Sequence, residues 1–99
     1  MDDDENVRRI FWYVFAGTKG GVTRLRIVDL LTKRPFNLNQ LSGKLGMDYK
    51  SIQHNIRVLE ENRIIVSEGG KYGALYFLSP LFKKSMHIFD EIQQGMQGG

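Results

Sequence analysis

The fold is decided by residues 37–62, which read NLNQLSGKLGMDYKSIQHNIRVLEEN. Asn37 followed by Gln40 is typical of a helix N-cap whose side chain is answered by the third helical residue. Three leucines at helical spacing then give one apolar stripe: Leu38, Leu41 and Leu45. Gly46 suits the left-handed conformation that ends many helices. The sequence therefore predicts a short helix that begins at residue 38 and ends at this glycine.

A second, longer helix follows after a tight turn. Asp48 is a good N-cap for it. Three apolar residues with helical spacing follow and should face the core: Ile52, Ile56 and Leu59. The opposite surface of a helix over residues 49–62 is then polar and basic, and it carries Tyr49, Lys50, Gln53, His54 and Arg57.

Beyond Arg63 the pattern changes to short runs rich in β-branched and aromatic residues. The first run is Ile64 to Glu68 and the second is Lys71 to Leu78, with Gly69-Gly70 between them. Two such runs around a glycine pair predict a β-hairpin with a tight turn, over about residues 64–78.

Further helices are expected on both sides of this segment. Apolar periodicity predicts them over residues 6–16, 22–33 and about 81–94. Gly20 and Gly21 allow the turn between the first two, Pro35 ends the second, and Pro80 opens the third.

Short helix, tight turn, longer helix and hairpin, in this order, describe a helix-turn-helix with a wing. We therefore expect one α+β domain over residues 1–99, a winged helix-turn-helix with extra N-terminal and C-terminal helices. Its parts are the helix-turn-helix at about 38–62, the wing at about 64–78 and a C-terminal helix at about 80–95.

This arrangement predicts double-stranded DNA as a partner. A major groove about 12 Å wide admits one helix, whose N-terminal part must present side chains that read base edges. The helix over 49–62 would lie in the major groove, and the wing over 68–73 would touch the backbone or the minor groove. The residues expected to contact DNA are Tyr49, Lys50, Ser51, Gln53, His54, Arg57, Lys71 and Tyr72.

Part of the chain also resembles a known family. The run from Leu41 to Ile65, with residues 70–73 and 76–79, is similar to the core of the arsenic-repressor-like (ArsR-type) winged-helix transcription regulators, especially archaeal ones. The similar region extends over residues 21–80. The resemblance implies a homodimer that binds operator DNA, with the helix over 49–62 as the reader.

Two departures from the family pattern have consequences. Family members commonly have a glycine at the position of Arg63. In this chain Asn62 or Arg63 must therefore adopt the left-handed backbone conformation that ends the helix, and asparagine adopts it with less conformational strain than arginine. The chain has no cysteine, which excludes an arsenic or cadmium sensor with thiolate ligands.

The C-terminal helix is the candidate for dimerisation. It carries an apolar strip of four side chains: Phe82, Met86, Phe89 and Ile92. The three central helices and the hairpin already make a compact core, so we expect this strip to form a dimer seam, with ordinary core packing as the alternative.

Composition and charge agree with a small DNA-binding domain. The 99 residues are 41% hydrophobic and 25% charged, as in ordinary globular proteins. Four acidic residues lie at the start, so residues 6–99 have 14 basic and 7 acidic groups, a net charge of +7 that suits a polyanion. The longest apolar stretch, residues 10–16, is too short for a bilayer, and we expect a cytoplasmic protein without membrane contact.

Other functions find less support. The strongest alternative is a winged-helix module that docks a protein partner through the same basic face. Lys19 to Arg24 begins like a phosphate loop but lacks its Gly-Lys-Thr; Lys19 and Arg24 are instead expected to touch DNA phosphate or solvent. His87, Asp90 and Glu91 could be metal ligands, but a solvated helix face fits them better. No arrangement of catalytic residues stands out, so we expect neither an enzyme nor a cofactor.

Overall fold

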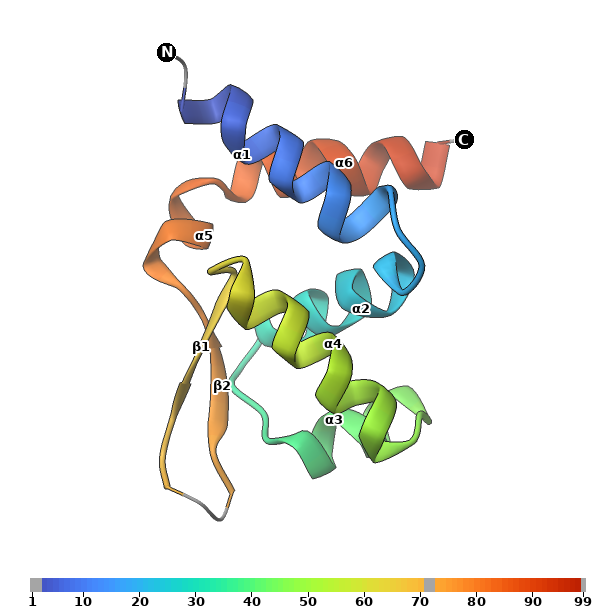
Figure 1. Cartoon of the computed structure of the whole chain (residues 1–99), viewed down its shortest axis with the longest axis vertical. Helices are drawn as coiled ribbons and strands as arrows, with labels where there is room; N and C mark the ends of the chain where they lie inside the picture. The colour runs from blue at the N-terminus through green and yellow to red at the C-terminus, as the bar shows by residue number, and fades with distance from the viewer. Residues whose placement is uncertain (1–2, 71–72, 99) are drawn as a thin grey trace.

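The computed structural model describes residues 3–70 and 73–98, which form helices and one hairpin (Figure 1). In chain order the elements are α1 (Asp3–Phe11), the π-helix η1 (Trp12–Ala16), α2 (Gly21–Leu31), α3 (Leu38–Leu45), α4 (Tyr49–Glu61), β1 (Ile65–Glu68), β2 (Leu75–Leu78), α5 (Pro80–Lys84) and α6 (Met86–Gly98). The two strands are antiparallel. The expected α+β arrangement, with helices before and after a helix-turn-helix and its hairpin, is confirmed.

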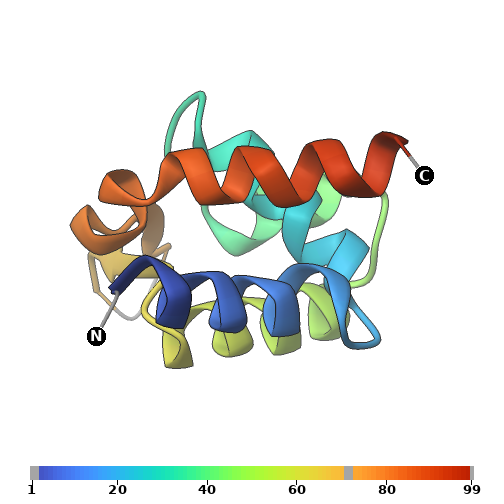
Figure 2. The ribbon, with the colours of Figure 1, turned by 90° about the horizontal axis from the view of Figure 1, so that it is seen from above.

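The helices at the two ends of the chain lie together. α1 and α6 run side by side in the same direction as a layer at one end of the molecule, and α3 lies at the other end (Figures 1 and 2). α2 and α4 lie between them, α4 extends from beside α5 to α3, and the hairpin lies beside α4 (Figure 1). Fully buried side chains from every layer share one core, among them Phe15, Ile27, Leu41, Ile56, Ile65 and Phe89.

The predicted helix caps are present. The Asn37 side chain accepts a hydrogen bond from the Gln40 amide at 2.8 Å, and the Gln40 side chain accepts one from the Asn37 amide at 2.9 Å. Gly46 ends α3 at a φ of 63°, and Asp48 caps α4 by accepting from the Ser51 amide at 3.2 Å. These local bonds set the angle at which α4 leaves the turn.

The expectation that Asn62 takes the left-handed turn is wrong. Arg63 has a φ of 60°, whereas Asn62 stays at −96°. The Asn62 side chain instead donates a hydrogen bond to the Val58 carbonyl at 2.9 Å and so caps the end of α4. The strained turn at Arg63 is held from both sides, because the Ile64 amide bonds the Leu59 carbonyl and the Arg63 carbonyl accepts from Ser79 Oγ.

The hairpin is confirmed, but its tight glycine turn is not. Glu68 pairs with Leu75, so the connection covers residues 69–74. Gly69 and Gly73 both have positive φ, at 110° and 86°, and β2 begins only after the second of them. The Tyr76 amide also bonds the Phe36 carbonyl at 2.9 Å, which ties the hairpin to the segment before α3. Lys71 and Tyr72 lie outside the described residues.

The terminal helices differ from their predicted extents. α1 begins at Asp3 and widens into a π-helix at Trp12, and the single C-terminal helix that was expected is two helices with a break at Ser85. Phe82 before the break and Phe89 after it lie in the same aromatic cluster, with ring centroids 5.3 Å apart. No helix in the described part of the chain is long and apolar enough to cross a membrane.

Most of the predicted dimer seam is part of the chain's own core. Phe82 and Phe89 are each 1% exposed and Ile92 is 5% exposed. Phe89 contacts Phe15 of η1, with ring centroids 5.1 Å apart. Met86 is half-buried against the same core. The strip therefore packs inward because α1 and η1 cover it, and a dimer contact through α6 needs its other residues.

Candidate nucleic-acid interface

α4 presents a polar face whose side chains have no partner within the described chain. Lys50, Gln53, His54 and Arg57 are exposed, and no hydrogen bond or ion pair to another described residue holds their side chains. Lys50 and Arg57 are seven residues apart and so share one direction, at the centre of the outward face. The structure thus brings the predicted helix residues together on one accessible surface.

The charge on this helix is divided along its length. Lys50, His54 and Arg57 lie in the first three turns, whereas Glu60 and Glu61 are exposed in the last turn. The Asp48 carboxylate at the start is occupied by the cap, and its hydrogen bonds to Ser51 hold its pKa below the ordinary value. The N-terminal part of α4 is therefore the part suited to a polyanion.

On one flank, α4 and the hairpin enclose a polar cleft of about 260 Å³. Tyr49 and Gln53 line it from α4, Asn39 lines it from α3, and Ala74 and Tyr76 line it from the hairpin. Burial raises the pKa of Tyr76, so its hydroxyl remains a hydrogen-bond donor at neutral pH. This flank offers neutral polar groups.

On the other flank, α4 and the start of α2 border an open groove of about 620 Å³. Lys50, Ser51 and His54 line it from α4, and Lys19 lines it from the loop between η1 and α2. The second flank is thus basic, and it places Lys19 next to residues predicted to contact DNA.

A buried arginine lies beneath this groove, and sequence reasoning missed it. Arg24 is 3% exposed, so the expectation that it contacts phosphate or solvent is wrong. Its guanidinium donates to the Val14 carbonyl at 2.8 Å, to Asn55 Oδ1 at 2.8 Å and to Thr18 Oγ1 at 2.6 Å. A fourth bond, to the Lys19 carbonyl, is 3.3 Å long. Burial lowers the pKa of Arg24, and none of the described carboxylates pairs with it.

Spacing could have revealed this contact. Arg24 lies four residues before Val28 and seven before Leu31, on the buried stripe of α2. Asn55 lies three residues after Ile52, on the buried side of α4, and is 6% exposed. Two polar residues at core positions of facing helices predict a hydrogen-bonded pair.

The sequence of this chain matches no protein-family model and no curated protein. Solved structures match it over nearly its whole length. The transcriptional regulator HlyU from Vibrio vulnificus superimposes with a TM-score of 0.72 at 12% identity, covering 92% of this chain and 88% of that one. A homodimeric winged helix-turn-helix DNA-binding domain from Mycobacterium bovis, a possible ArsR-family regulator, gives 0.69 at 14%, covering 98% and 87%.

This chain has the winged helix-turn-helix fold. HlyU from Vibrio cholerae covers the whole of both chains, with a TM-score of 0.71 and 13% identity. At these identities the likeness concerns the fold, and it confirms the resemblance to ArsR-type regulators at that level. The archaeal subtype finds no support in it. In winged-helix terms, α3 and α4 are the helix-turn-helix and the β1–β2 hairpin is the wing.

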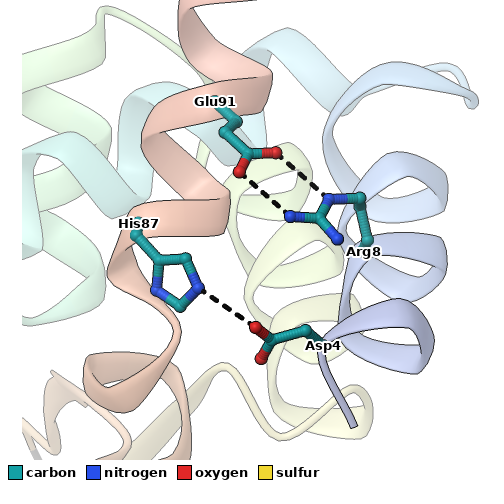
Figure 3. Close-up of polar contacts among 4 residues, drawn as sticks. All are labelled: Asp4, Arg8, His87 and Glu91. Atoms are coloured by element: carbon teal, nitrogen blue, oxygen red, sulfur yellow. Dashed lines mark hydrogen bonds and ion pairs between the residues drawn. The ribbon is translucent and has the colours of Figure 1, made fainter. Parts of the chain in front are cut away.

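The helices added to this winged-helix core are joined by polar contacts (Figure 3). Arg8 of α1 donates two hydrogen bonds to the Glu91 carboxylate of α6, at 3.0 and 3.1 Å. His87 Nε2 lies 3.5 Å from an Asp4 carboxylate oxygen. Within residues 3–70 and 73–98 there is no cluster of three side chains able to hold a metal ion. His87 and Glu91 therefore join α1 to α6 in this chain.

Proposed function

We propose that this protein is a homodimeric transcription regulator that binds specific sequences in double-stranded DNA. The observation that carries the proposal is the exposed, unpartnered face of α4. Lys50, Gln53 and Arg57 lie on this face in the first three turns of the helix that a winged-helix protein inserts into the major groove. Arginine and glutamine are suited to bidentate contacts with guanine and adenine edges. The similar structures described as DNA-binding or as transcriptional regulators support it.

The wing supplies the second part of the interface. Residues 68–73 are assigned to the DNA backbone or the minor groove, with Lys71 and Tyr72 as the contacting side chains. Glu68 ends β1, and the paired strands β1 and β2 extend beside α4, away from α1 and α6 (Figure 1). A hairpin in this position reaches the duplex next to the groove that holds the recognition helix.

The dimer surface is assigned to the outer side of α1, η1 and α6. Two apolar side chains there are strongly exposed: Trp12 at 57% and Tyr13 at 57%. Trp12 also lines a groove of about 360 Å³ with Ile92, Gly95 and Met96 of α6. Exposed apolar groups of this size mark contact surfaces. The homodimeric domain from Mycobacterium bovis supports a second copy as the partner.

The proposal is tested with Arg57→Ala and Gln53→Ala in duplex-binding titrations by fluorescence anisotropy. Each side chain is exposed, so the thermal stability should stay unchanged. Each lost base contact should weaken specific binding by about 1–3 kcal/mol. The matched control is Lys84→Ala, an exposed cation on α5 that is outside the helix-turn-helix and should leave specific binding unchanged.

Salt dependence separates DNA binding from protein docking. With three or four phosphate contacts per subunit, log affinity should fall with log salt at a slope near −6. If Arg57→Ala and Gln53→Ala both bound the specific duplex with wild-type affinity, α4 would not be the helix that contacts the bases. Absence of duplex binding at about 50 mM salt would favour a winged-helix module that docks an acidic protein.

A further inference from the structure

We propose that the loop between η1 and α2, residues 17–20, is a third DNA-contacting element, in which Lys19 binds a backbone phosphate and Arg24 is the residue that positions it. The inference rests on the proposed function, since it extends the same interface. It adds a contact outside the recognition helix and the wing.

The first argument is the shared groove. Lys19 lines the same open groove as Lys50, Ser51 and His54 of the recognition helix. The residues that line it include two lysines and a histidine but no carboxylate. Lys19 is exposed, and no described acidic side chain forms an ion pair with it. A basic groove without a counter-ion is a binding surface for an anion.

The second argument is the position of this groove relative to the wing. α4 has the wing on one flank and the Lys19 loop on the other. A helix that lies in the major groove has a phosphate backbone on each side of it, because the groove is only about 12 Å wide. The wing flank would then face one backbone, and the Lys19 flank would face the other. Duplex phosphate is therefore the anion that this groove fits.

The third argument is how firmly the loop is fixed. Arg24 bonds Thr18 Oγ1 and the Lys19 carbonyl in the loop, the Val14 carbonyl before it, and Asn55 of α4. One planar guanidinium thus joins the loop to the recognition helix. A contact group held at a fixed place loses little entropy on binding.

The glycine at the end of the loop shows the same close fit. Gly20 has a φ of 92°, and a Cβ there would lie 2.9 Å from an Arg24 nitrogen and 3.0 Å from Asn55 Oδ1. The chain therefore passes directly over the Arg24–Asn55 pair. The buried cation beneath also adds positive potential to the groove, since none of the described carboxylates neutralises it.

The experiment measures the affinity of the full chain for a specific and a random duplex from about 50 to 200 mM salt. Lys19→Gln should flatten the log–log slope by about two per dimer, one contact per subunit, for both duplexes. Over this range the wild-type affinity should then fall about tenfold more than that of the variant. Lys84→Gln on α5 makes the same charge change and should leave the slope unchanged.

A double-mutant cycle tests the role of Arg24. Arg24→Lys keeps the charge but cannot reproduce the four hydrogen bonds of the guanidinium. If Arg24 positions Lys19, then Lys19→Gln should have little effect in the Arg24→Lys background, whereas a role in stability alone leaves the two effects additive. Thr18→Val, which removes one of the Arg24 bonds, replaces Arg24→Lys in the cycle if that variant does not fold.

The outcomes distinguish the two proposals. Duplex binding with identical slopes for Lys19→Gln and Lys84→Gln would overturn the loop contact and leave the recognition helix in place. Additive effects in the cycle would overturn the positioning role of Arg24. Absence of any duplex binding by the wild-type protein would refute the proposed function itself.

Discussion

Replacing Phe89 with alanine tests whether the apolar side of α6 belongs to the core of one chain or to a dimer seam. The ring is 1% exposed and contacts Phe15 and Phe82, with centroids 5.1 and 5.3 Å away. Truncating a buried phenylalanine costs about 3–5 kcal/mol, a large part of the roughly 5–15 kcal/mol that stabilises a domain. For a chain of this size the melting temperature should fall by at least about 12 °C.

The matched change is Trp12→Ser on the exposed side of η1. Because Trp12 is 57% exposed, its loss should change the stability of one folded chain by only about 0.5 kcal/mol. It should however dissociate the proposed dimer, as sedimentation velocity would show. If the wild-type protein is this dimer, its melting temperature should rise with protein concentration, and that of Trp12→Ser should not.

The reasoning is refuted by the opposite pair of results. A Phe89→Ala protein that keeps the wild-type free energy of unfolding but sediments as a monomer would make Phe89 a seam residue. A Trp12→Ser protein that remains a dimer at micromolar concentration would remove the outer side of η1 from the interface.

Three further predictions concern the backbone and the caps, and circular dichroism during denaturation measures each. Gly21→Ala should destabilise the fold strongly, because the added Cβ would lie 2.5 Å from the Phe15 carbonyl oxygen. Gly43→Ala in α3 has open space around the added Cβ and should stabilise the fold by up to about 1 kcal/mol. Equal changes in the free energy of unfolding for the two variants would contradict this reasoning. Arg63→Gly should stabilise the protein by about 0.5–1 kcal/mol because it relieves a φ of 60°, and a loss of stability would show that the turn is unstrained. Hydrogen bonds to Ser51 in the folded state lower the pKa of Asp48. The stability that the ionised Asp48 cap contributes is therefore present above the ordinary pKa of 3.8 and is lost as the pH falls through the lower pKa of the folded state. Asp48→Asn keeps a cap without a titrating carboxyl and should lose less stability over that acid range than the wild type.

The features that were predictable from the sequence are those that depend on neighbouring residues. The capping box of Asn37 and Gln40, the glycine at 46 and the Asp48 cap each act within one helical turn, so their residue types specify them. The polar face of α4 follows from the positions of Ile52, Ile56 and Leu59 in the same way.

The features that were missed depend on contacts between distant segments. The spacing places Phe82 and Phe89 on one apolar strip, but it does not show that Phe11 and Phe15, more than seventy residues earlier in the chain, cover that strip. Spacing places Arg24 and Asn55 each on the buried side of its helix, but only the packing of α2 against α4 brings these two residues, thirty-one positions apart, into contact. The left-handed turn fell on Arg63 because Asn62 was used to cap α4, a competition that residue preference alone could not resolve.

The most direct test of the central claim is selection of duplexes from a random pool by the wild-type protein. If two copies each place α4 in the major groove, the recovered sequences should form a palindrome with half-site centres about 10–10.5 base pairs apart, or a multiple of that spacing. Recovery of a pool that remains random, at a salt concentration where the protein binds duplex DNA, would contradict sequence-specific reading by α4.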